Sequence, residues 1–291
     1  MPLYWPLLEP TGALEILAHR MVWSLAVVGV LVVVGARRSG TPLTGPDGRF
    51  GFLWRRGVPA LLTVAAVVVA VNWGVYIWAV NNDHVVDASL GYFVNPLVSV
   101  ALGVAVFRER LRPLQWAALG IAAAGVLELT VAAGRVPWTA LVLAVSFGVY
   151  GLVKKLAAAP AVESLAWETA VLFLPALGFL VVLSVTGRGT FGTVGTGHSL
   201  LLASTGLVTA LPLLLFGAAA TRIPLSTLGL LQYLTPTMQF LLGVLLFGEQ
   251  VPPARLVGFV VIWAALALFT ADVLRARPRR STAQRVAAPA A

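Results

Sequence analysis

Residues 88–113 read ASLGYFVNPLVSVALGVAVFRERLRP, and residues 228–253 read LGLLQYLTPTMQFLLGVLLFGEQVPP. The second stretch repeats the first at an offset of 140 residues, so that Pro96 aligns with Pro236, Gly103 with Gly243, Phe107 with Phe247, Glu109 with Glu249 and Pro113 with Pro253. Each stretch contains an apolar run of the length that crosses a bilayer as a helix, about 20 residues. The repeat therefore predicts two related halves, each built from membrane-spanning helices.

Segments of similar length and apolarity continue outward from both copies. They lie at 13–35, 58–80, 88–107, 114–133, 136–154, 163–186, 199–220, 225–247 and 252–273, with a short apolar piece at 1–8. Across the chain, 59% of residues are apolar, 11% are charged and the mean hydropathy is +0.93, a composition that excludes an ordinary soluble enzyme. We therefore expect an all-α integral membrane protein. The absence of cysteine excludes disulfides and thiolate metal sites.

The N-terminal residues have neither the basic start nor the small-residue cleavage site of a signal peptide. The second half has a full span at 136–154 where the first half has only residues 1–8. We therefore interpret residues 1–8 as the truncated first helix of about ten transmembrane helices. We expect either a start codon assigned too late or a variant that lacks half a helix.

Basic residues indicate the orientation of the spans. Of the 20 Lys and Arg residues, 16 lie in alternate loops or the tail, whereas the intervening loops hold only Arg135, Arg188 and Arg255. The positive-inside rule then predicts that the basic loops and the C-terminus are cytoplasmic. Span 88–107 enters a basic loop and span 225–247 leaves one, so the repeats are inverted. We expect a first repeat at 1–134, a second at 135–274 and a disordered basic tail at 275–291.

Five strings carry a resemblance to a known family. ALEILAHRMVWS (13–24), NWGVYIWAVNN (72–82), ASLGYFVNPLVSV (88–100), RLRPLQW (110–116) and PLSTLGLLQYLTPTMQFLLGVLLFGE (224–249) resemble RarD-type permeases of the EamA group of the drug/metabolite transporter superfamily. The resemblance implies ten helices in two inverted five-helix repeats, alternating access, cytoplasmic termini and a chloramphenicol-sensitivity phenotype, without naming the cargo. The family's first helix is longer than the present one, and its Asn-Gly-His turn reads Asn82-Asp83-His84 here.

Two polar stripes follow the repeat. Tyr92, Asn95 and Ser99 share one helical face, and Gln232, Thr235 and Gln239 occupy the equivalent positions in the second copy. We predict that both stripes, with Tyr233, line a central substrate pocket, and that Pro96 and Pro236 act as hinges. The alternative is hydrogen bonding between the repeats, with the prolines setting helix shape alone.

Further polar and aromatic residues lie inside other spans. Asn72, Trp73 and Tyr76 are expected in the same pocket, because an aromatic wall with an amide suits neutral or amphipathic organic solutes. An interfacial aromatic belt is the alternative, which we favour for Trp78. Glu109 and Glu249 are interpreted as structural hairpin caps, and Lys154 and Lys155 as cytoplasmic anchors.

Ionisable residues concentrate in the span that begins at residue 13. Glu15, His19 and Trp23 recur every fourth residue, and Arg20 is adjacent, with Glu15 or Glu128 as its candidate partner. This cluster suits anion recognition or a proton-coupled switch, but a structural ion pair would show the same pattern. Glu168 occupies the position in the second repeat that is equivalent to His19 in the first. It is our first choice for a protonatable group. We assign His19, Arg20, Trp23 and Glu168 to the substrate site.

Missing motifs narrow the function. The sequence has no GxxxxGK phosphate loop, no HExxH or GxSxG motif and only three scattered histidines. We therefore expect no catalytic residues, metal or cofactor, and a secondary permease for a small organic solute in the bacterial inner membrane. Its partners would be that solute, the bilayer, a coupling proton and a second copy of the chain, but not nucleic acid. The alternative is a membrane-embedded enzyme that acts on a lipid with Glu15, His19 and Glu168.

Overall fold

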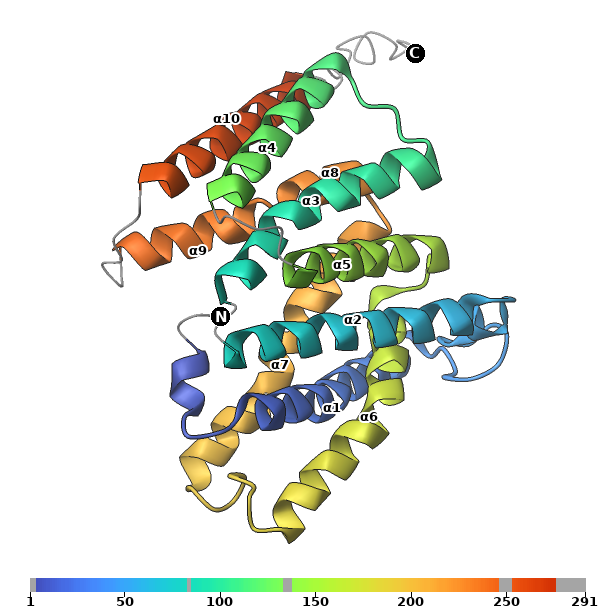
Figure 1. The fold of residues 1–291 in the computed structure, drawn as a ribbon. Helices are drawn as coiled ribbons and strands as arrows, with labels where there is room; N and C mark the ends of the chain where they lie inside the picture. Colours follow the sequence, from blue (N-terminus) through green and yellow to red (C-terminus); the bar gives the residue numbers. More distant parts are fainter. Residues whose placement is uncertain (1–3, 83–84, 133–137, 246–252, 276–291) are drawn as a thin grey trace, which may run out of the picture.

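The computed structural model describes residues 4–82, 85–132, 138–245 and 253–275, and the regular elements in these residues are all helical (Figure 1). In chain order they are η1 (Trp5–Leu8), α1 (Ala13–Ser39), η2 (Gly51–Trp54), α2 (Val58–Asn81), α3 (Val85–Phe107), α4 (Pro113–Ala132), α5 (Trp138–Ala157), α6 (Ala161–Val185), α7 (Thr196–Ala220), α8 (Leu225–Leu231), α9 (Leu234–Leu245) and α10 (Pro253–Arg275). Each α-helix falls within a few residues of an expected segment.

The expected span 225–247 is divided into α8 and α9, with Gln232 and Tyr233 between them. Pro236 accounts for the position of this break, because a proline ring clashes with the carbonyl four residues earlier, here that of Gln232. Pro96, the equivalent proline of the first copy, lies inside a continuous α3. The two copies therefore differ in helix continuity, and the Gln232 and Tyr233 backbone separates two shorter helices.

Length and hydropathy identify the membrane-crossing elements. Five helices in the described residues, α1, α2, α5, α6 and α7, are long and apolar enough to cross a membrane. Shorter apolar stretches lie within α3 (Gly91–Phe107) and α10 (Leu256–Asp272). Many large apolar side chains on these helices are exposed, including Val185 and Leu215. Contact of these apolar side chains with lipid is favourable, whereas their exposure to water is not.

The helices pack in a connected series (Figure 1). α4 pairs with α10 at one side, α3 lies between α5 and α8, α2 packs on α5 and α6, and α1 packs on α6 and α7. Glycines permit the closest crossings: a Cβ on Gly229 of α8 would lie 2.7 Å from the Ser99 Cβ of α3. At the α1–α7 crossing, Ser24 donates a hydrogen bond of 3.2 Å to the Gly206 carbonyl.

Polar contacts join the loops at one end of the bundle. Arg49, in the loop after α1, donates from Nε to Glu163 Oε1 at the start of α6 (2.6 Å). Arg112, before α4, pairs with Asp272 near the end of α10 (2.8 Å). Lys155, at the end of α5, donates to the Ile223 carbonyl before α8 (2.7 Å). The predicted basic loops therefore contact one another or the adjoining helix ends.

Glu109 has the structural role expected of it, but on a different helix. Its carboxylate accepts hydrogen bonds from the backbone N–H groups of Leu225 (2.7 Å) and Ser226 (2.8 Å), at the start of α8. A carboxylate at this position satisfies backbone donors that a helix leaves unpaired at its N-terminus. Glu109 thus caps a helix of the other half of the chain. Glu249 lies outside the described residues.

Candidate functional site

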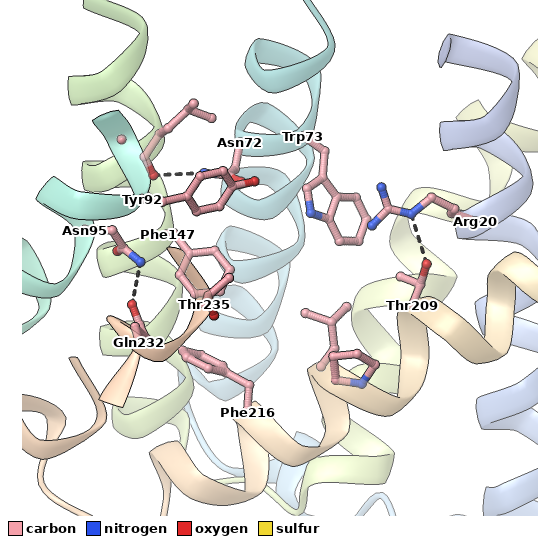
Figure 2. Close-up of a pocket in the computed structure, with 14 residues that line it drawn as sticks. Arg20, Asn72, Trp73, Tyr92, Asn95, Phe147, Thr209, Phe216, Gln232 and Thr235 are labelled. Carbon is pink, nitrogen blue, oxygen red and sulfur yellow. Dashed lines mark hydrogen bonds between the residues drawn. The ribbon is translucent and has the colours of Figure 1, made fainter. Parts of the chain in front are cut away.

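A central cavity of about 320 Å³ lies where α1, α2, α3, α5 and α7 approach the break between α8 and α9 (Figure 2). It draws residues from both halves of the chain. Its lining consists of Arg20, Asn72, Trp73, Gly91, Tyr92, Asn95, Leu143, Phe147, Thr209, Pro212, Leu213, Phe216, Gln232 and Thr235. Most of this surface is apolar, with a few polar groups, as in sites for small organic ligands.

Two amides meet across the interface between the halves. Asn95 of α3 donates from Nδ2 to Gln232 Oε1, the residue that follows α8 (Figure 2). Asn95 Oδ1 and Gln232 Nε2 are buried and have no hydrogen-bond partner among the described residues. If both amides were turned over, one donor and one acceptor would still remain unused. The pair therefore leaves one hydrogen-bond donor and one acceptor unpaired beside the cavity.

Arg20 supplies a positive charge at the α1 side of the cavity. Its Nε donates to Thr209 Oγ1 of α7 (2.9 Å), and its guanidinium carbon lies 4.5 Å from the centre of the Trp73 ring (Figure 2). A guanidinium over an indole face is a favourable cation–π arrangement. Glu15, one of its expected partners, instead accepts hydrogen bonds from Thr190. Arg20 is therefore oriented by α2 and α7.

Asn72 fixes the opposite wall. Its Nδ2 donates both to the Leu143 carbonyl (2.9 Å) and to Ser146 Oγ (2.9 Å), which ties α2 to α5. Phe147 lies one turn after Leu143 on α5 and packs on Phe216 of α7, with ring centres 5.1 Å apart. The cavity thus has an aromatic floor between its amide groups and Arg20.

The structure brings half of the sequence-predicted site residues to this cavity: Arg20, Asn72, Trp73, Tyr92, Asn95, Gln232 and Thr235. Tyr76 stands behind the lining, with its ring centre 6.1 Å from that of Tyr92. Ser99 is buried against Gly229, and Tyr233 is buried in the core around α4 and α10. The side chain of Gln239 lies outside the described part of the structure.

Some lining residues were not predicted. Phe147, Pro212, Phe216 and Thr209 come from α5 and α7. The sequence gives little sign of them, because an aromatic residue in an apolar span is equally compatible with lipid contact or core packing. The only available indication was Thr209 and Pro212 inside an apolar span, since a proline frees a backbone carbonyl there.

His19 and Trp23 are separated from Arg20, although all three lie on α1. They line a second cavity of about 290 Å³ between α1, α6 and the loop that joins α6 to α7. Neighbouring residues on a helix are about 100° apart around the axis, so His19 and Arg20 face different sides. The prediction that His19 and Trp23 share one pocket with Arg20 does not agree with the geometry.

Glu168 belongs to a buried polar network next to the central cavity. Lys154 Nζ lies 2.6 Å from Glu168 Oε1 and also donates to Ser164 Oγ (2.6 Å), while Tyr150 donates to Glu168 Oε2 (3.0 Å). The side chains of Lys154 and Glu168 are each 3% exposed. Lys154 is therefore not the surface anchor that the sequence predicted, and its ion pair with the Glu168 carboxylate of α6 explains its burial.

The network touches the cavity in two ways. The Tyr150 ring stacks on Phe216, with centres 5.7 Å apart. Glu168 also lines a narrow gap behind the cavity, together with Arg20, Trp73 and Thr209. Glu168 and His19, which the enzyme alternative requires in one site, therefore have different surroundings. The described residues hold no cluster of three metal-ligating side chains.

Comparisons with known proteins show which family this chain belongs to. A model of the EamA-like transporter family matches residues 7–131. Protein RarD of Streptomyces exfoliatus is 56% identical over 99% of this chain and 89% of that protein. Protein RarD of Escherichia coli is 40% identical over 96% of this chain and 92% of that protein.

A more distant relative and a solved structure extend the comparison. The Pseudomonas aeruginosa protein named chloramphenicol-sensitive protein RarD is 32% identical over 96% of this chain and 93% of that protein. One crystal structure superposes with a TM-score of 0.67 at 21% identity, covering 94% of this chain and 93% of that chain. At this identity the match concerns the fold alone.

Proposed function

We propose that this chain, which belongs to the RarD group of the EamA-like transporter family, is a secondary active transporter whose solute passes through the central cavity. The family consists of membrane transporters, and the chain is a multi-pass membrane protein. The observation that carries the proposal is the unused donor and acceptor of the Asn95–Gln232 pair, held between the two halves. Unpaired buried amides cost free energy unless a ligand or water satisfies them.

The lining favours a small organic solute with an aromatic or apolar body. Trp73, Phe147 and Phe216 provide the apolar surface, and the amide pair provides hydrogen bonds. At one end of the cavity, the guanidinium of Arg20 donates hydrogen bonds to a carboxylate or another electron-rich group of the solute. Chloramphenicol, after which the P. aeruginosa relative is named chloramphenicol-sensitive, is a neutral aromatic amide and matches this chemistry.

Helix pairing supports two inverted repeats and alternating access. If α1 corresponds to α6, α2 to α7, α3 to α8–α9 and α4 to α10, then the contacts α1–α6, α3–α8 and α4–α10 each join equivalent helices. The contact of α1 with α7 corresponds to that of α6 with α2. Contacts that map onto one another in this way are expected of two repeats related by a twofold axis. Rocking of one repeat against the other would open a site between them to each side of the membrane in turn.

The basic loops support a cytoplasmic location for one end of the bundle. The contacts of Arg49, Arg112 and Lys155 link the loops that hold most of the positive charge. In a bacterial inner membrane such loops remain on the cytoplasmic side. The C-terminal end of α10 lies near Arg112 and would therefore also be cytoplasmic.

Glu168 is the group that we assign to a coupling proton. Its carboxylate shares a narrow gap with the lining residues Arg20, Trp73 and Thr209. Glu168 also has a cationic partner in Lys154, and Tyr150 connects it to Phe216. Protonation of Glu168 would leave Lys154 with an uncompensated charge, which favours rearrangement of α5 against α6. Substrate binding and protonation of Glu168 would thus be coupled, because both depend on the positions of the same helices.

Uptake by purified protein in liposomes tests the proposal. Amino acids, nucleosides and aromatic drugs, including labelled chloramphenicol, are screened with and without a pH gradient across the membrane. We expect at least one solute to accumulate above protein-free liposomes, and Asn95→Leu to remove that uptake because the hydrogen-bonding pair is lost. Asn82→Leu is the matched control, since Asn82 is exposed at the end of α2. Full uptake by Asn95→Leu would contradict the assignment of the cavity.

A further inference from the structure

We propose that the second cavity, between α1, α6 and the α6–α7 loop, binds the ammonium group of an amphipathic amine. This cavity has a volume of about 290 Å³ and lies at the end of α1 that is remote from Arg37 and Arg38. Its buried polar groups are Glu15 and His19, both more than nine-tenths buried, and its aromatic walls are Trp23 and Phe191. The hydroxyl residues Ser184 and Thr193 line its exposed side. The inference does not depend on the proposed transport through the central cavity.

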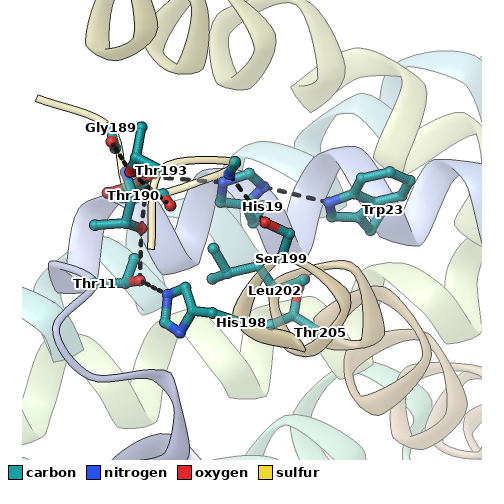
Figure 3. A network of polar contacts seen from close by, with 12 residues as sticks. Thr11, His19, Trp23, Gly189, Thr190, Thr193, His198, Ser199, Leu202 and Thr205 are labelled. Carbon is teal, nitrogen blue, oxygen red and sulfur yellow. Dashed lines mark hydrogen bonds and ion pairs between the residues drawn. The ribbon is translucent and has the colours of Figure 1, made fainter. Parts of the chain in front are cut away.

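A directed chain of hydrogen bonds ends at Glu15. Thr190 donates to Glu15 Oε1 from its backbone N–H (2.7 Å) and from its hydroxyl (3.0 Å). Because this proton is used, the Thr11 hydroxyl must donate to Thr190 (2.7 Å), and His198 Nε2–H must then donate to Thr11 (2.7 Å; Figure 3). Every donor in this chain points toward the carboxylate, so the network holds Oε1 of Glu15 in place.

The second carboxylate oxygen is the available one. Both hydrogen bonds from Thr190 go to Oε1, and no described residue donates to Glu15 Oε2. The carboxylate therefore keeps an acceptor for a cation while its first oxygen holds it in place. Glu15 is 6% exposed, so an ammonium group that reaches it leaves most of its water behind and gains a strong interaction.

His19 contributes a donor and no charge. Trp23 Nε1 is a donor only, and it lies 3.3 Å from His19 Nδ1, so Nδ1 must be the acceptor and the ring proton must be on Nε2 (Figure 3). His19 Nε2 is buried without a hydrogen-bond partner, and its nearest acceptor, Glu15 Oε1, is 3.9 Å away. A hydroxyl or carbonyl oxygen on the ligand would satisfy this N–H.

Aromatic rings complete the cation site. Phe191 stacks on His19 with ring centres 5.0 Å apart, and the Trp23 and Phe191 rings are 6.0 Å apart. Rings beside a carboxylate are the usual surroundings of bound organic ammonium groups. Val22, Leu177 and Val181 add apolar surface for the body of the ligand.

Positive groups near the cavity do not enter it. Arg188 lies between two lining glycines, Gly187 and Gly189, but is itself exposed and does not line the cavity. Arg20 faces the central cavity, where it contacts Thr209 and Trp73. Among the described residues that line this cavity, Glu15 is therefore the one with a charge, and a carboxylate in an aromatic setting selects a cation over an anion.

Calorimetric binding to the detergent-solubilised full chain tests this site with three probes of one shape: phenylethanolamine (a cation), phenylethanediol (uncharged) and mandelate (an anion). We expect phenylethanolamine to bind at least tenfold more tightly than phenylethanediol, and Glu15→Gln to leave the affinity for mandelate unchanged, because an aromatic carboxylate fits the Arg20 end of the central cavity. Glu15→Gln should remove the preference for the amine, whereas Asp47→Asn, which deletes the same charge from an exposed loop, should keep it. Equal affinity for amine and diol, or an unchanged preference in Glu15→Gln, would overturn the proposal.

Phe191→Leu keeps the test decisive if Glu15→Gln does not fold. Phe191 is 44% exposed, so its loss should leave the bundle intact and weaken phenylethanolamine binding three- to tenfold. Unchanged binding in a folded Phe191→Leu protein would overturn the site. Competition by short-chain phosphatidylethanolamine, but not phosphatidylglycerol, would identify a lipid headgroup as the source of the ammonium. Failure of both lipids to compete would identify a soluble amine.

Discussion

At the scale of single residues, Lys154 and Glu168 form a buried ion pair between α5 and α6. Both side chains are almost fully buried, Lys154 also donates to Ser164, and Tyr150 donates to Glu168. Removing one partner of a buried ion pair typically costs about 3–5 kcal/mol, because the other charge is left uncompensated, whereas replacing both by apolar groups is often neutral.

We therefore expect Lys154→Met and Glu168→Leu each to lower the thermal unfolding temperature of the purified protein, and the double variant to recover most of the loss. Unfolding followed by tryptophan fluorescence in one detergent measures all four proteins. If the double variant loses the sum of the two single effects, the two groups do not depend on each other.

Glu109 gives a pH-dependent prediction. Burial alone would raise the pKa of its carboxyl, but hydrogen bonds from Ser226, Leu225 and Lys155 outweigh burial and lower that pKa below the usual value. The folded-state pKa is then below the unfolded one, so the carboxylate stabilises the fold above the unfolded pKa, and this contribution is lost as the pH falls through the folded pKa.

The difference in unfolding temperature between wild type and Glu109→Gln should accordingly be large near neutral pH and should shrink below about pH 4. Thermal unfolding at a series of pH values checks this. A difference that stays constant with pH would show that the charge of Glu109 does not stabilise the start of α8.

Residue patterns predicted some lining residues and misplaced others for identifiable reasons. Asn95 and Gln232 were found because amides are costly inside a span and because the repeat aligned their helices. Lys154 was misinterpreted because its partner, Glu168, lies on the next helix. A local sequence pattern does not predict contacts between residues of different helices. Phe147 and Phe216 were missed because lipid, core and cavity all accept phenylalanine.

At the scale of elements, the crossing of α1 and α7 depends on Gly206. A Cβ at this position would meet the backbone and Cβ of Trp23, and backbone cannot move aside without shifting α1. Added volume at such a contact typically costs about 1–3 kcal/mol. The same crossing carries the hydrogen bond from Ser24 and brings Arg20 to Thr209.

Gly206→Val should therefore destabilise the protein and disturb the central cavity. Gly120→Val is the matched control, because a Cβ on Gly120 of α4 meets nothing within 4 Å. Unfolding temperatures of the two variants, measured together, decide the point: equal values would mean that close approach at Gly206 is not required.

Helix positions were largely predictable, since long apolar runs bounded by Gly, Pro and Arg leave little choice of where a span begins and ends. The break between α8 and α9 was not predicted. Pro236 signalled a hinge, but Pro96 occupies the equivalent position in a continuous helix, so the proline alone does not determine whether a helix divides. Tyr233 and its equivalent in the first copy, Phe93, both pack in the α4–α10 core, so this core does not account for the difference.

At the scale of the whole molecule, both halves of the chain together form the central cavity. α1, α2 and α3 contribute Arg20, Trp73 and Asn95, and the second half contributes Phe147, Thr209 and Gln232. The sequence predicted two related halves because their helix-breaking residues recur at one offset. It did not predict that α5 and α7 supply much of the lining, since that follows from how the halves pack.

Labelling of an introduced cysteine tests the central claim most directly, and the natural chain has no cysteine to interfere. Thr235 lines the cavity, whereas Leu215 of α7 is 64% exposed on an apolar face. In sealed vesicles, alternating access predicts that a membrane-impermeant maleimide reacts with Thr235→Cys from either side of the membrane, and with Leu215→Cys from neither. Reaction of Thr235→Cys from one side only, or from neither, would contradict a transport path through this cavity.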